Sequence, residues 1–459
     1  MKPLSVTWSG FRGFRRPTSL FFPGITLLIG RNNVGKTSAY APLLLLRQTL
    51  DARNPRTALL SRGQLIDAGP YRDFVSDHDT SRAVSFTVGI PGGADVQVGR
   101  RTESARIGSV ELRFRSGEGN NVVLESQRII DSSGRPLVTR TRETGTGYYN
   151  VTSRVLPDRQ SVGRPLREVT ELRSGMRTEQ PEGFLFRGYG GLLLPSAFRE
   201  DPARWAKIQN WYNAASNLYH IHSQLNNELV HLLRQISYVG PLRSLPQRTY
   251  RLAAEAPGDV GHTGESAPEI LFRQRSSRVP EEVDAWLTRL GYGTLEFDSL
   301  GDEYFQVHLN VPSGARVNLA HCGVGLSQLL PLLVQGTMAR AGSTMIAQQP
   351  EIHLNPAQQC IATDFLVKQA SRGVRVVIET HSEHVLLRLR RRIAEGELDA
   401  DGVAVYYVDY DKGQTSIQKI ELGPLGEVDR NDWPVGFFEE QLEDSFGLAT
   451  AQSTRRQVR

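Results

Sequence analysis

The pattern of apolar and polar positions divides the first part of the chain into short strands and one helix. Residues 25–29 are largely aliphatic and lack the alternation of apolar and polar positions, which predicts a strand that is buried on both faces. Residues 38–50 follow with the spacing of a helix, and residues 5–8, 84–98 and 110–115 are predicted as further strands. The N-terminal part is therefore expected to be rich in β-structure.

Helical spacing begins at residue 201, where Asp201 and Pro202 are a predicted N-cap and first turn, and continues to Ile236. Beyond this point the predicted helices are 326–339, 356–371 and 383–395, and the predicted strands are 343–347, 374–379, 403–409 and 415–421. Strands that alternate with helices indicate a largely parallel α/β sheet.

Composition excludes several classes of protein. The 459 residues include 39% hydrophobic residues, enough for a large core, and only two cysteines, Cys322 and Cys360. Two cysteines do not form a disulfide scaffold or a thiolate zinc site. The first ten residues lack an apolar signal segment, and the longest aliphatic run, residues 43–46, is far shorter than the roughly 20 residues of a membrane span. We expect a soluble cytoplasmic protein without a membrane partner.

Charge is unevenly distributed. The stretch 100–187 contains sixteen arginines, no lysine and eleven carboxylates, so its net charge of +5 equals that of the whole chain. Such a stretch is either a nucleic-acid-binding surface or a solvated insertion in a chain that uses arginine almost everywhere in place of lysine.

A phosphate-binding loop follows the predicted strand 25–29. It reads Gly30, Arg31, Asn32, Asn33, Val34, Gly35, Lys36 and Thr37, and Ser38 continues it into the helix. This fits G-x-x-x-x-G-K-[ST] at every fixed position. The two glycines let backbone N–H groups surround a phosphate, Lys36 neutralises the outer phosphates, and the Thr37 hydroxyl is a ligand for Mg²⁺. The sequence therefore predicts a nucleotide-binding protein.

Three further polar clusters lie at the ends of predicted elements. Residues 321–330 place Gly323, Gly325, Ser327 and Gln328 at the head of an apolar helix. Gln348 and Gln349 end one predicted strand, and residues 379–383, which include His381, end the next. Open parallel sheets bind their ligands at the carboxyl ends of the strands, so the two strand-end clusters are expected beside a ligand. The glycines and serine at the head of the helix suit an anionic oxygen.

Taken in this order, the clusters resemble those of ABC-type ATPase heads of the SMC, RecF and OLD kind. The resemblance implies a Walker A loop at Gly30–Thr37, a signature motif at Gly323–Gln328, Walker B positions at Gln348 and Gln349, a D-loop at Leu354–Pro356 and a switch histidine at His381. It also implies ATP and Mg²⁺ as cofactors. The expected fold is an α/β ATPase head with a mixed or parallel sheet core, a β-rich N-terminal lobe and an α+β insertion.

The resemblance divides the chain into four segments. These are 1–95, the N-terminal part of the head; 96–235, an Arg-rich insertion of β-hairpins and helices; 236–400, the C-terminal part of the head; and 401–459, C-terminal strands and tail. Three segments look more narrowly like a prokaryotic subgroup associated with anti-phage defence: residues 236–265, with SYVGPLRSLPQRTY and GDVGHTGE, then ETHSEHVLLRLRRRI and DWPVGFFEEQL. Heads of this kind dimerise, with ATP between Lys36 of one chain and Ser327 of the other.

The Walker B segment departs from the expected pattern. Where this chain has Gln348, related sequences usually carry a carboxylate that holds Mg²⁺ beside Thr37, so the resemblance makes Gln348 a candidate metal ligand. At the position of Gln349 they often carry a glutamate that polarises the attacking water. A glutamine cannot accept a proton, so we expect ATP to bind and to be hydrolysed slowly. Either a Glu→Gln substitution at 348 was introduced to trap ATP, or the natural site is degenerate. The nearby Glu351 is expected to brace the D-loop.

The rest of the sequence shows no pattern typical of a second active site or of coiled-coil arms. Only 78 residues follow His381, without the acidic pattern of a Toprim nuclease, and no heptad repeat persists as in SMC arms. The leading hypothesis is an ATP-dependent sensor or regulator of a separate effector protein. The alternative is a RecF-like repair ATPase that holds DNA through residues 100–187.

Overall fold

The computed structural model describes residues 3–93, 95–98, 103–156, 180–186, 202–411 and 413–429. The expected N-cap Asp201, much of the Arg-rich stretch and the tail segment DWPVGFFEEQL lie outside these residues.

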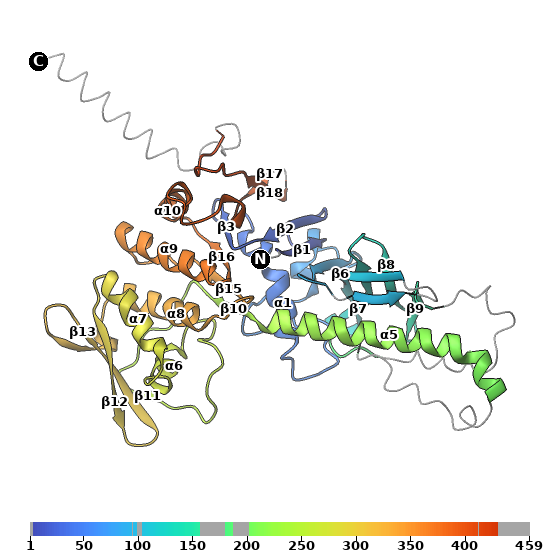
Figure 1. Ribbon diagram of the computed structural model, residues 1–459, viewed down its shortest axis with the longest axis horizontal. Coiled ribbons are helices and arrows are strands. Elements are labelled where there is room, and N and C mark those ends of the chain that lie inside the picture. Colours follow the sequence, from blue (N-terminus) through green and yellow to red (C-terminus); the bar gives the residue numbers. More distant parts are fainter. Residues whose placement is uncertain are drawn as a thin grey trace, which may run out of the picture.

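A six-stranded sheet lies at the centre of the described chain (Figure 1). Its strands, in spatial order, are β10 (Ile236–Val239), β15 (Thr344–Gln348), β16 (Arg375–Glu379), β3 (Ile25–Ile29), β17 (Val403–Asp411) and β18 (Gln414–Ile420). The first five strands pair in parallel, and β18 pairs with β17 in antiparallel fashion. The predicted α/β fold with a mixed, largely parallel sheet is confirmed.

The central sheet is buried on both faces, as its aliphatic strands predict. In β3, the side chains of Ile25, Leu27 and Ile29 join one hydrophobic core, and Leu28 joins another. Strand alternation explains this division, because neighbouring side chains point to opposite faces. The α-helices of the described residues are α1 (Ala41–Thr49), α2 (Tyr71–Phe74), α5 (Pro202–Arg234), α6 (Ala267–Arg273), α7 (Arg278–Arg289), α8 (Val324–Met338), α9 (Pro356–Ser371) and α10 (Glu383–Ala394), and the 3₁₀ turn η1 (Lys36–Ala39) precedes α1. Helices α8, α9 and α10 contribute to the first core, and α1 and α5 to the second.

An antiparallel sheet forms the N-terminal lobe. Its strands are β1 (Leu4–Ser9), β2 (Thr18–Phe22), β4 (Val84–Gly89), β5 (Asp95–Val98), β6 (Glu103–Ser116), β7 (Val122–Asp131), β8 (Pro136–Arg142) and β9 (Tyr149–Ser153). The segment 84–98, predicted as one strand, forms two strands, because residues 91–93 with their two glycines form a turn. Strand β6 pairs with β4, so the described part of the insertion continues the sheet that residues 1–95 begin.

A third sheet was not predicted. It consists of β11 (Tyr250–Arg251), β12 (Thr294–Leu300), β13 (Tyr304–Asn310) and β14 (Arg316–Asn318), all paired antiparallel. Together with α6 and α7 it packs beside α8 (Figure 1). The helical spacing of residues 201–236 is confirmed as one helix, α5, which lies along the antiparallel sheet. None of the described helices combines the length and apolar character needed to cross a bilayer.

The contact between α5 and the antiparallel sheet is predicted to be sensitive to acid. His222 on α5 is fully buried, its Nδ1 lies 2.8 Å from the Leu218 carbonyl oxygen, and burial together with the charge of Arg140 lowers the pKa of His222 to about 3. The unfolded chain therefore binds a proton below about pH 6.5 that the folded chain does not bind until about pH 3. Stability should fall between these values as the pH decreases, by about 2 kcal/mol at pH 5 from this group.

Urea denaturation at pH 7 and pH 5 tests this prediction. His222→Leu should lose this part of the pH dependence, whereas His220→Leu, which changes an exposed histidine on the same helix, should retain it. Equal pH dependence in the two variants would contradict the assignment.

Candidate functional site

The phosphate-binding loop lies between the end of β3 and the 3₁₀ turn η1. Gly30 has a φ of 144°, and a Cβ there would lie 2.1 Å from the Val408 carbonyl oxygen, so only glycine fits. Gly35 has a φ of 100°, also in the left-handed region. Between them, the predicted ligands Arg31, Asn32 and Asn33 are exposed. The loop therefore has the backbone conformation that its two glycines predict.

Lys36 folds back over this loop. Its ammonium group donates to the carbonyl oxygens of Gly30 at 3.0 Å and Arg31 at 2.5 Å. Burial lowers the pKa of Lys36, while the carboxylates of Glu379 and Glu351 raise it. The helix predicted from residue 38 begins as η1 at Lys36, and α1 follows. The Lys36 ammonium group is thus held at the loop, where the oxygens of an anionic ligand could replace the two carbonyl oxygens as its acceptors.

The ends of β15 and β16 bring two polar side chains to Thr37. The Thr37 hydroxyl donates to Glu379 at 3.0 Å, and the Gln348 amide nitrogen donates to both Thr37 Oγ1 and Glu379 Oε1 at 3.2 Å. Residues more than 300 positions apart in the sequence meet here because β3, β16 and β15 are adjacent and parallel. The sequence placed Glu379 in the polar cluster 379–383 but did not predict its contact with Thr37.

Two tyrosines surround this group of polar side chains. Tyr40 donates to Glu379 at 2.6 Å, and Tyr238 donates to Gln348 Oε1 at 2.5 Å. Burial raises the pKa of Tyr40 well above its usual value and that of Tyr238 to about 12, so both hydroxyls remain donors at neutral pH. The oxygen of Gln348 is therefore bonded to Tyr238, and its NH₂ group faces Thr37. This arrangement does not suit the expected role of Gln348 as a metal ligand.

The segment around His381 is fixed by Glu351. The His381 backbone N–H donates to Glu351 Oε1 at 3.0 Å, and the Leu354 N–H donates to the Glu351 carbonyl oxygen at 3.1 Å, so Glu351 contacts both the loop after β16 and the start of the expected D-loop. Burial and the neighbouring Lys36 lower the pKa of His381. Gln349 has a left-handed φ of 46°, and its N–H donates to the Glu379 carbonyl oxygen at 2.7 Å. Both effects favour the neutral form of the His381 imidazole.

The predicted signature motif lies at the start of α8, but its serine does not face outward. Ser327 and Gln328 are buried, with exposures of 4% and 5%. The N-cap Gly323 and the next residue, Val324, are exposed instead. The helix turns its fourth and fifth residues toward the core, so the groups that another molecule could reach first are the backbone groups around Gly323.

A buried arginine joins α8 to the end of β15. Arg243 donates to the carbonyl oxygens of Gln328 at 2.7 Å and Gln348 at 3.0 Å. Burial lowers the pKa of Arg243 to about 10, while Glu351 and Tyr238 raise it. The residue lies in a segment that contributed to the family resemblance, but nothing in its spacing indicated this role.

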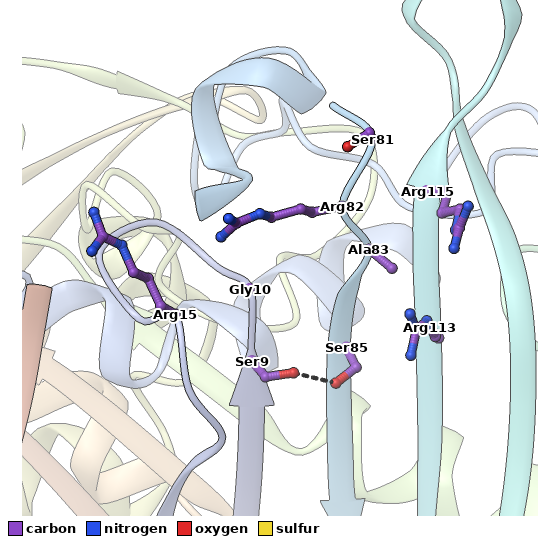
Figure 2. Close-up of a pocket in the computed structure, with 9 residues that line it drawn as sticks. All are labelled: Ser9, Gly10, Arg15, Ser81, Arg82, Ala83, Ser85, Arg113 and Arg115. Atoms are coloured by element: carbon purple, nitrogen blue, oxygen red, sulfur yellow. Dashed lines mark hydrogen bonds between the residues drawn. The ribbon is translucent and has the colours of Figure 1, made fainter. Parts of the chain in front are cut away.

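A second group of cations lines a hollow at the antiparallel sheet, formed by residues of β1, β4 and β6 and of the segments beside them. Figure 2 shows the hollow lined by Ser9, Gly10, Arg15, Ser81, Arg82, Ala83, Ser85, Arg113 and Arg115. Its four arginines form ion pairs with three carboxylates, those of Asp77, Asp79 and Glu125, at 2.5–3.2 Å. Most of the positive charge in this hollow is therefore compensated within the chain.

Comparisons with known proteins give a short family match and distant structural neighbours. A family described as "Protein of unknown function (DUF3696)" matches residues 398–448, and curated proteins give no significant match. Among solved structures, the chain is similar to the SMC head domain from Thermotoga maritima, with 11% identity and a TM-score of 0.36 over 92% of this chain and 100% of that chain. It is also similar to an Smc head bound to the C-terminal winged-helix domain of ScpA, with 12% identity and a TM-score of 0.39 over 92% and 98% of the two chains. It is likewise similar to an Smc head with an extended coiled coil, bound to the C-terminal domain of ScpA from Pyrococcus furiosus. The identity there is 10% and the TM-score is 0.38, over 92% of this chain and 96% of that chain.

Proposed function

We propose that the protein is an ABC-type ATPase head that binds ATP with Mg²⁺, hydrolyses it slowly and dimerises in the ATP-bound state. The observation that carries this proposal is the meeting of the phosphate-binding loop with the ends of β15 and β16. Thr37, Gln348 and Glu379 lie within 3.2 Å of one another beside Lys36. A phosphate loop with polar strand ends at the carboxyl edge of a parallel sheet is a site for a nucleoside triphosphate.

The residues of this site have distinct parts in binding. The N–H groups of the loop and the Lys36 ammonium group bind the β- and γ-phosphates, and Thr37 holds the cation. Bound Mg²⁺ would neutralise phosphate charge. Gln348 and Gln349 orient groups by hydrogen bonding but accept no proton, and the neutral His381 is placed to donate or accept one near the γ-phosphate. Slow turnover follows from the lack of a carboxylate at 348 and 349.

The start of α8 supports the proposed dimer. Its exposed N-terminal end presents backbone N–H groups and the positive end of the helix dipole, which together favour an anionic oxygen. We place the backbone around Gly323 against the γ-phosphate of a second copy. The buried Ser327 hydroxyl could contact that phosphate only if the first turn of α8 opened.

We further propose that the ATP-bound dimer regulates a separate effector, as the resemblance to defence-associated ATPases suggests. A slow ATPase suits this role, because the ATP-bound dimer persists long enough for a partner protein to bind it. Co-purification with products of neighbouring genes in ATP, but not in ADP, would support it, and the absence of any such partner in both states would contradict it. The alternative, DNA binding through residues 100–187, is less favoured because arginines of the described part are paired with carboxylates.

Replacing Gln348 by glutamate should raise ATP turnover about fivefold, because a carboxylate would be restored next to Thr37. Steady-state phosphate release measures this effect. Gln224→Glu is the control, because it makes the same change at an exposed position of α5. Unchanged turnover in Gln348→Glu would indicate a naturally degenerate site.

A further inference from the structure

The carboxylate next to the phosphate-binding threonine comes from an unexpected strand. Glu379 ends β16 and is 5% exposed, and both of its oxygens lie within 3.3 Å of the Thr37 hydroxyl. The Walker B strand β15 ends instead in Gln348, which presents an NH₂ group. Among the described residues that hydrogen-bond to the Thr37 hydroxyl, Glu379 alone carries a negative charge.

The chemistry of this group fits a magnesium ion. Mg²⁺ prefers oxygen ligands and is usually bound through one or two carboxylates together with the phosphates of its nucleotide. By accepting the proton of Thr37, Glu379 leaves the two lone pairs of that hydroxyl oxygen as acceptors: one accepts from the Gln348 amide, and the other is available to a cation. Its charge also interacts with Lys36, which the pKa of that lysine reflects. A metal cation would therefore lie beside the negative charge of Glu379, and the triphosphate beside the positive charge of Lys36.

We propose that Glu379, not a residue of the Walker B strand, is the carboxylate that holds the nucleotide's Mg²⁺ in this protein. This inference rests on the proposed function, because it assumes that the loop binds ATP. Gln348 then has a positioning role, since its NH₂ group links Thr37 to Glu379 while Tyr238 fixes its oxygen.

The Tyr40 hydrogen bond suggests a competing role, in which Glu379 only joins α1 to the sheet. The two roles differ in their dependence on the divalent ion. A purely structural carboxylate would affect stability alike with and without Mg²⁺. A carboxylate that holds the cation would affect ATP affinity only when Mg²⁺ is present, and without Mg²⁺ its negative charge would repel the triphosphate.

The test is the dissociation constant of ATP measured with saturating Mg²⁺ and with EDTA. In the unmodified chain, Mg²⁺ should tighten ATP binding at least about tenfold. In Glu379→Gln, this gain should fall to about twofold or less, and binding in EDTA should be unchanged or tighter. Glu383→Gln, four residues further along the chain in the first turn of α10, is the control and should keep the full gain.

The outcomes separate this inference from the proposed function. If the unmodified chain binds no ATP in either condition, the proposed function is wrong. If it binds ATP and Glu379→Gln keeps the full gain, the assignment of Glu379 is wrong and the proposed function stands. Should Glu379→Gln fail to fold, Gln348→Glu decides, because two facing carboxylates should make ATP binding more dependent on Mg²⁺ than in the unmodified chain. No increase would overturn the inference.

Discussion

Lys36→Ala is expected to weaken ATP binding about 100-fold, because the loop would lose its charge-assisted contacts with the outer phosphates. Lys36 is only 5% exposed. Its ammonium group donates to two carbonyl oxygens of the loop, so it already lies where a phosphate would bind. The carboxylates of Glu379 and Glu351 favour its charged form. Titration with a fluorescent ATP analogue measures the change.

The control for this variant is Lys368→Ala. Lys368 is exposed in the last turn of α9, so its removal should leave ATP affinity unchanged. Equal affinities in the two variants would show that the phosphates are not bound by the loop at Gly30–Thr37.

Gly323→Glu is expected to abolish the ATP-dependent dimer while leaving the fold and ATP binding by the single chain intact. A Cβ on Gly323 would meet nothing within 4 Å, and its φ of −62° suits any residue. The glycine is therefore not required by the chain's own packing. Gly325 differs, because a Cβ there would lie 2.9 Å from the His353 carbonyl oxygen. A glutamate at 323 would place a negative charge against the partner's γ-phosphate.

Sedimentation velocity with ATP and with ADP measures this prediction. The matched control is Gly402→Glu, at the opposite end of the parallel sheet, where a Cβ would meet only Asp399 Cβ at 3.9 Å. The control should dimerise with ATP as the unmodified chain does. A dimer that persists in Gly323→Glu would exclude the start of α8 from the interface.

Local patterns in the sequence were sufficient for the core of this site. The largely aliphatic segment 25–29 forms β3 with the predicted bounds. The two glycines of the phosphate-binding loop adopt left-handed conformations, as expected for a loop that surrounds a phosphate. The helix predicted at 356–371 is α9 with the same bounds, because Asn355 and Pro356 are a strong N-terminal signal.

The parts that sequence reasoning missed depend on contacts between distant segments. Glu379 belongs to the site only because β16 lies between β3 and β15, and linear order does not specify that arrangement. Arg243 acts through the carbonyl oxygens of two other elements, for which the sequence has no signal. Ser327 was expected at the surface, but the actual start of α8 at Val324 turns it inward.

The most direct test of the account is a structure of the unmodified chain with ATP and Mg²⁺. The account predicts two copies face to face, with each γ-phosphate bound by Lys36 of one copy and by backbone N–H groups around Gly323 of the other. A nucleotide whose γ-phosphate lies far from α8 of either copy would contradict it and would leave a nucleotide-binding protein without the shared site.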